Sequence, residues 1–284
     1  MTRRPPGSTG NFQRTIDRFR HLTATGVATD VLRAAKLAIT DPLPQPASSR
    51  SERIVVSLST IPERATRLRP TLRSLLDQTC PADRIVLAWP ATTFRNHRPY
   101  PPVPPIPAGV DILPCEDSGP ATKLIPATIA EPDSILVIVD DDVIYPRTFL
   151  ADLLRAHRTH RDAALGLRGW HIASGIDWPR HIFGTGITEP VSVDVLLGTW
   201  GILIPPTALG PDISDFTGWP PEIRWADDVW TSGHLARRAI PRLVIPATGL
   251  PIETRTSTIN ALSTGINRTG TGYHSGISAF QQWW

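Results

Sequence analysis

Residues 135–142 read ILVIVDDD, and this stretch decides the fold class of the 284-residue chain. Ile135 to Val139 is a continuous apolar run of the kind that a parallel sheet buries on both faces. Three carboxylates follow at once, and Pro146 to His160 then carries apolar residues at helical spacing. A buried strand that ends in charged groups and leads into a helix indicates an α/β protein, in which ligands bind beyond the carboxyl ends of the strands.

The same alternation extends towards the N-terminus. We expect three earlier strands and two helices, namely strands at about 53–59, 84–89 and 110–113 and helices at about 68–76 and 123–130. After residue 160 the chain becomes rich in Gly, Trp and Pro, with strands expected at 192–197, 201–204 and 242–245 and a helix that opens at 227. The pattern predicts a Rossmann-like, mostly parallel sheet flanked by helices, followed by a smaller mixed region.

Composition and charge exclude several classes of protein. With 40% hydrophobic residues the chain can form a large core, and no apolar run approaches the length of a spanning helix. The net charge of +3 combines about +5 in residues 1–50 with about −2 in the rest, so the main body has no basic surface for nucleic acid. Cys80 and Cys115 lack the spacing of a zinc site.

The N-terminal arm carries most of the basic excess. Its apolar residues recur at helical spacing from about Asn11 to Thr40, and we expect Thr23 to Gly26 to divide the segment into two short helices. Such an arm either packs on the main domain or makes a peripheral contact with a membrane surface. Because no signal-peptide core precedes it, we expect a cytoplasmic protein, with any membrane contact at the inner face.

The three adjacent aspartates predict a divalent cation site. Neighbouring carboxylates repel one another unless a cation neutralises them, and hard oxygen ligands suit Mn²⁺ or Mg²⁺. Because side chains alternate along a strand, Asp140 and Asp142 can project to one side, with Asp141 between them. We expect Asp142 to ligate the metal and Asp140 to reach the metal, its water or a ribose hydroxyl. The alternative is an acidic turn that caps the next helix.

Two further loops follow strands and offer groups suited to a nucleotide. Gly119 allows a tight turn before a helix N-terminus, and Lys123, one of two lysines in the chain, could neutralise a diphosphate. The small polar side chains of Ser57 and Thr60 and the cation of Arg64 suit a base and phosphate site at the end of the first strand. An ordinary loop with a solvated lysine is the alternative for the first of these.

An acid pair opens the helix at 227. Asp227 and Asp228 could simply cap that helix, because carboxylates are favoured at helix N-termini. The alternative is catalytic: Asp228, between Trp225 and Trp230, could take a proton from a hydroxyl group.

Two other residues are candidates for ligand contact. Trp200 lies in the segment Gly198-Thr199-Trp200-Gly201 and could present its ring to a sugar. The alternative is that the ring is buried in the core, where tryptophan is commonly found. His274 lies in a Gly-rich tail that could fold over a site and supply a metal ligand. An unligated surface position is the alternative for His274.

Together these segments resemble nucleotide-sugar glycosyltransferases of the GT-A fold, either family-2-like or exostosin-like. The resemblance covers about residues 53–250 and rests on SLSTIPER at 57–64, SLLDQT at 74–79, GPATKL at 119–124, VDDD at 139–142 and the helix-opening acid pair. It implies that Asp140 and Asp142 lie at the donor ribose and metal. In inverting family-2-like members the second acid, here Asp228, is the base, whereas exostosin-like members retain configuration. This chain has Asp-Asp where many inverting members have Glu-Asp, so both outcomes stay open.

The resemblance also implies an activity and a division of the chain. We expect a metal-dependent transfer of sugar from a nucleotide-diphosphate donor to a hydroxyl group of a glycan or lipid-linked acceptor, in glycan or polysaccharide assembly. An arm and linker at 1–52 would precede a domain at 53–284, with a nucleotide half at 53–145 and an acceptor half at 146–284. The rivals are a haloacid-dehalogenase-type phosphohydrolase, disfavoured because three strands precede the aspartates, and a non-catalytic carbohydrate-binding module.

Overall fold

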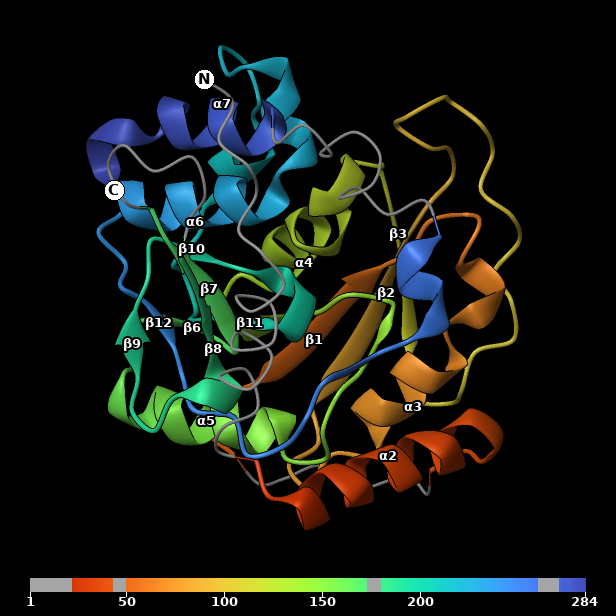
Figure 1. The fold of residues 1–284 in the computed structure, drawn as a ribbon. Coiled ribbons are helices and arrows are strands. Elements are labelled where there is room, and N and C mark those ends of the chain that lie inside the picture. The colour runs from red at the N-terminus through yellow and green to blue at the C-terminus, as the bar shows by residue number, and fades with distance from the viewer. Residues whose placement is uncertain (1–21, 43–49, 173–179, 260–270) are drawn as a thin grey trace, which may run out of the picture.

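The computed structural model describes residues 22–42, 50–172, 180–259 and 271–284. A sheet of eight strands in the order β3-β2-β1-β4-β11-β6-β12-β9 runs through its centre (Figure 1). Its strands are β1 (Ile54–Ser59), β2 (Arg84–Pro90), β3 (Asp111–Cys115), β4 (Ile135–Ile138), β6 (Ala164–Gly166), β9 (Val191–Ser192), β11 (Ile202–Ile204) and β12 (Arg242–Val244). The strands β3, β2, β1 and β4 are parallel, and β11 is antiparallel to β4. The fold class that the sequence predicts is therefore confirmed.

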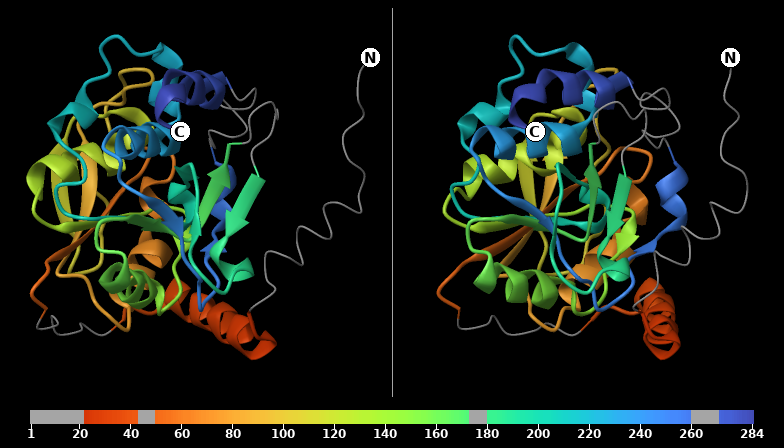
Figure 2. Two further views of the ribbon diagram at one scale, coloured as in Figure 1. Left: turned by 90° about the vertical axis from the view of Figure 1, so that its left-hand side faces the viewer. Right: turned by 60° about the vertical axis from the view of Figure 1, so that its left-hand side comes forward.

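Helices cover both faces of the sheet. On one face lie α4 (Ile125–Ala130), α6 (Asp227–Arg237) and α7 (Thr271–Ala279), and on the other α3 (Arg69–Leu76) and α5 (Phe149–Thr159) (Figures 1 and 2). The apolar strands explain this layering because alternate residues enter different cores: Val56 of β1 packs on the α3 and α5 side, and Val55 packs on the α4 and α6 side.

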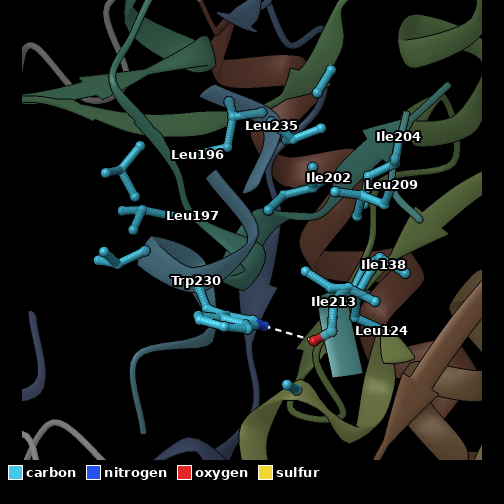
Figure 3. Close-up of a cluster of buried hydrophobic side chains, with 14 of the residues drawn as sticks. Leu124, Ile138, Leu196, Leu197, Ile202, Ile204, Leu209, Ile213, Trp230 and Leu235 are labelled. Carbon is cyan, nitrogen blue, oxygen red and sulfur yellow. Dashed lines mark hydrogen bonds between the residues drawn. The ribbon is translucent and has the colours of Figure 1, made fainter. Parts of the chain in front are cut away.

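One core anchors the helix that carries the acid pair. In Figure 3, Trp230 of α6 lies among Leu, Ile and other apolar side chains, and its indole N–H donates to the carbonyl of Ile213 at 2.9 Å. Trp230 is completely buried, and its ring fixes α6 against the sheet.

The expected strand at 192–197 is two strands in different sheets. Ser192 pairs with β12, whereas β10 (Val195–Leu196) joins β7 (Arg168–His171) and β8 (Arg180–Phe183) in a three-stranded sheet. Asp194 lies at the crossing, where its carboxylate accepts the amide of Ile172 at 2.6 Å and its carbonyl accepts the guanidinium of Arg242 at 2.8 Å. These long-range bonds redirect the chain, and local periodicity does not show them.

The N-terminal helix α2 (Ala24–Ile39) packs on the main body. Thr23 begins this helix by accepting the amide of Gly26 at 3.0 Å, so the predicted break falls at a helix start. Arg33 attaches α2 to Asp77 at 2.7 Å, while Leu32 and Ile39 are 73% and 81% exposed. No helix among the described residues is long and apolar enough to cross a membrane. Residues 1–21 lie outside the described residues, so the membrane contact stays a prediction.

Candidate active site

A cavity of about 770 Å³ opens at the carboxyl ends of β1, β2 and β4. Its wall contains most of the predicted site residues, namely Thr60, Arg64, Gly119, Lys123, Asp140, Asp141, Asp142, Asp227 and Asp228. In α/β proteins, ligands bind beyond these carboxyl ends of the strands. Ser57 does not line the cavity; it is buried below, and its hydroxyl donates to the carbonyl of Lys123 at 2.6 Å.

The main chain of the three aspartates is fixed from neighbouring elements. The amide of Asp140 donates to the hydroxyl of Tyr145 at 2.9 Å, and Thr71 of α3 donates to the carbonyl of Asp141 at 2.9 Å. The carbonyl of Asp142 accepts the amide of Thr254 at 2.7 Å, beside the pair formed by β5 (Val143–Ile144) and β13 (Ile252–Glu253). With their backbone groups bonded in this way, the carboxylates are held in the cavity wall.

Arg64 partly neutralises this cluster. One guanidinium nitrogen lies 2.8 Å from both Asp141 and Asp142, and Thr60 donates to Asp141 at 2.5 Å. Even so, burial raises the pKa of Asp141, and burial with repulsion from Asp140 raises that of Asp142 to about 7. Burial and mutual repulsion therefore disfavour the ionised carboxylates, and a cation would stabilise their ionised form.

Lys123 lies between the two acidic groups of the site. Its ammonium group contacts Asp140 and lies 2.9 Å from Asp227. Burial opposes the charge of Lys123, but Asp140, Asp227 and Asp228 together raise its pKa well above the ordinary value. Lys123 is thus a permanent cation at the centre of the cavity.

Asp228 makes a different set of contacts from Asp227. Its Oδ1 accepts the amide of Gly198 at 2.8 Å, and burial, reinforced by Asp227, raises its pKa to about 8. A Cβ at Gly198 would lie 2.9 Å from Lys123 Nζ and 3.1 Å from this Oδ1, so a larger residue here would displace these two charged groups. Ala226 is the N-cap residue of α6, and both acids lie in the first turn of that helix, so the helix-terminus role and the catalytic role both stay open here.

Two predicted roles do not hold in the structure. Trp200 is 0% exposed and packs against Phe183 at 5.5 Å between ring centroids, so no sugar can stack on it. His274 is exposed on α7 and does not line the cavity, whereas its neighbour Tyr273 does. Gly119 has a φ of 69°, which agrees with the tight turn expected there, and its amide donates to Asp117 at 2.8 Å.

Sequence reasoning missed several residues of the wall. Asp117 accepts the amide of Phe94 at 2.8 Å and holds the loop after β2 against the loop after β3. Its place just after an expected strand was a usable signal. Arg168, Trp170 and Tyr273 reach the cavity only through pairings distant in the sequence, and no local signal marks them.

The donor set fits a divalent cation that arrives with a phosphate ligand. Within the described ranges, no three His, Cys, Asp or Glu side chains are close enough to form a metal cage by themselves. Asp140 and Asp142 offer hard carboxylate oxygens to the same cavity. Mg²⁺ is usually held by one or two carboxylates with water and substrate phosphates completing its shell, which agrees with this arrangement.

The architecture is similar to that of solved glycosyltransferase structures. One is the mannosyltransferase PcManGT from Pyrobaculum calidifontis in complex with GDP-Man and Mn²⁺, with a TM-score of 0.50, 14% identity, and coverage of 95% of this chain and 74% of that one. Another is S. aureus TarS 1–349 in complex with UDP, with a TM-score of 0.44, 17% identity, and coverage of 72% and 61%. No family model and no curated protein sequence matches the chain. At such identities the likeness shows the fold alone.

Proposed function

We propose that this chain is a metal-dependent glycosyltransferase that moves a sugar from a nucleoside-diphosphate donor to a hydroxyl group of a glycan or lipid-linked acceptor. One observation carries the proposal: Asp228 and the three aspartates after β4 line one cavity, and Lys123 contacts both acidic groups. The similarity in fold to a mannosyltransferase that was solved with GDP-Man and Mn²⁺ supports the same conclusion.

The cations of the site suit the leaving diphosphate. Breaking a sugar–phosphate bond places negative charge on the departing phosphate, and fixed cations lower the energy of that state. Lys123 and Arg64 supply such charge from the chain, and a bound Mn²⁺ or Mg²⁺ would add more at Asp140 and Asp142. Tyr145 and Thr71 hold the main chain of residues 140–142, the aspartate turn, in place.

Asp228 is suited to accept the proton of the attacking hydroxyl. Asp227 is paired with Lys123 at 2.9 Å, whereas Asp228 accepts only a backbone amide among the bonds of the described residues. Its pKa of about 8 means that a proton taken from the acceptor is held near neutral pH. The ionised form, which the reaction needs, is favoured when positive charge enters the cavity.

Neither rival accounts for the cavity. In a haloacid-dehalogenase-type phosphatase the nucleophilic aspartate follows the first strand, but here β1 ends in Ser59 and the acids follow β4. A carbohydrate-binding module does not explain why three carboxylates follow a buried strand and line the cavity.

The direct test measures release of UDP, GDP or CDP from their sugars with Mn²⁺ and methyl glycoside acceptors. We expect Asp228→Asn and Asp142→Ala to lower turnover by about 100-fold or more. Asp133→Asn, which changes an exposed carboxylate, is the matched control and keeps the wild-type rate. Wild-type turnover in either site variant would reject the assigned roles.

A further inference from the structure

One wall of the cavity combines aromatic rings with a guanidinium group. Arg168 and Trp170 alternate along β7 and both line the cavity. Across the strand pair, Arg168 lies opposite Phe183, with its guanidinium 5.0 Å from that ring, and Trp170 lies opposite His181. Tyr273 of α7 packs on Trp170 at 5.1 Å between centroids.

This wall is linked to the proposed base by two hydrogen bonds. The amide of Leu197 donates to the carbonyl of Arg168 at 2.9 Å, and the next amide, of Gly198, donates to Asp228 at 2.8 Å. The loop at 93–100 forms the other end of the cavity, beyond β2 and over the parallel half of the sheet. A nucleotide at those parallel strand ends leaves the β7 wall to the second substrate.

Among the described residues of the β7–β8 pair, Arg168 is the cation that lines this wall. Trp170 donates its indole N–H to His181 Nδ1 at 3.0 Å, and the two rings lie edge to face at 5.4 Å between centroids. A guanidinium binds carboxylate or phosphate oxygens in a fork, and aromatic rings pack on sugar faces.

We propose that the acceptor is a saccharide with an anionic substituent, a carboxylate or a phosphate, which Arg168 binds while Trp170 and Tyr273 contact the sugar ring. The inference rests on the proposed function, because it assigns the wall to the second substrate of that reaction. It makes Arg168 a residue that determines acceptor specificity.

The test measures binding of methyl hexosides to the full chain by saturation-transfer NMR, in the gluco, galacto and manno series. Each neutral hexoside is compared with its 6-carboxylate and its 6-phosphate, which separates the two sources of charge. We expect at least one anionic form to bind about tenfold or more tightly than its neutral parent. Arg168→Gln should remove this preference without weakening the binding of UDP or GDP.

The matched control is Arg237→Gln, because Arg237 also lies over aromatic rings, at 5.6 Å from Trp219 and 5.3 Å from Trp283, but outside the cavity. It should keep the charge preference. The inference is overturned if neutral and anionic hexosides bind alike, if Arg168→Gln keeps the preference, or if that variant loses nucleotide affinity. Failure of the proposed function is separate, since it would appear as no turnover of any nucleotide sugar by the wild type.

Discussion

At the scale of single residues, the site is built from charges that burial disfavours. The raised pKa values of Asp142 and Asp228 mean that the folded chain without ligand holds these carboxylates against a free-energy penalty. Such a penalty is expected where catalysis needs a group that stability does not favour. It is relieved when a cation enters the cavity.

The first consequence is a dependence of stability on pH. In the unfolded chain Asp228 ionises near the ordinary value of 3.8, whereas in the folded chain its pKa is about 8. Between these values the folded state binds more protons than the unfolded state, so the free energy of unfolding falls as pH rises. The Asp228→Asn substitution removes this contribution to the pH dependence of the free energy of unfolding. The asparagine still offers an oxygen to the amide of Gly198.

Thermal unfolding without metal or nucleotide, from about pH 5 to pH 8, checks this expectation. The Tm of Asp228→Asn should decline less with pH than the wild-type Tm, and at pH 8 the variant should be the more stable protein. The exposed-carboxylate variant Asp133→Asn should follow the wild type. Parallel curves for all three proteins would show that Asp228 is not destabilised by burial.

Gly198 allows a second prediction at this scale. The Cβ of an alanine would lie 2.9 Å from Lys123 Nζ, the mobile end of a long side chain, so Lys123 can move and the fold can persist. We expect Gly198→Ala to lower turnover by about tenfold or more while the free energy of unfolding changes by less than about 1 kcal/mol. Steady-state kinetics and urea titration of the same sample provide both values; full activity would show that the position of Lys123 is not critical.

At the scale of elements, α6 packs closely against Phe280, the residue that follows α7. A Cβ at Gly233 of α6 would lie 2.3 to 2.4 Å from the ring of Phe280, which is fully buried and cannot move aside. Gly233→Ala should therefore lower the free energy of unfolding by about 1–3 kcal/mol, despite the better helix propensity of alanine. Urea unfolding measures it, with the exposed Ser278→Ala of α7 as the neutral control; an unchanged or higher stability would contradict the packing.

Elements that the sheet buries on both faces were predictable from sequence. The runs that form β1, β2 and β4 are mostly apolar, and burial on two faces leaves few alternatives for such runs. The predictions of one strand at 192–197 and of a ligand-facing ring at Trp200 were wrong, because strand pairing and burial there depend on residues distant in the sequence. Gly201, with a φ of 87°, turns the chain so that Trp200 enters the core rather than the cavity.

The residues of the candidate site also fall into those that the sequence predicts and those that it does not. Acids and a lysine near strand ends were visible in the sequence because carboxyl ends of parallel strands meet at one edge. The pairing of Arg64 with the aspartates and the wall of Arg168 and Trp170 depend on three-dimensional contacts that no local spacing encodes.

At the scale of the whole molecule, the cavity joins parts of the chain that are far apart in sequence. Lys123 and Asp140 come from the parallel half, while Asp227 comes from α6 after the mixed region, and the three meet around one ammonium group. The cavity exists only in the folded chain, so a ligand that binds there stabilises the fold by mass action.

The measurement that tests the central claim most directly is calorimetric titration of UDP and GDP into the wild type and Asp142→Asn, each with and without Mn²⁺. If the aspartate turn holds a cation against a donor diphosphate, Mn²⁺ should tighten binding of at least one nucleotide by about tenfold or more in the wild type, and Asp142→Asn should abolish that gain. Equal affinities with and without Mn²⁺, or an unchanged gain in the variant, would contradict the account.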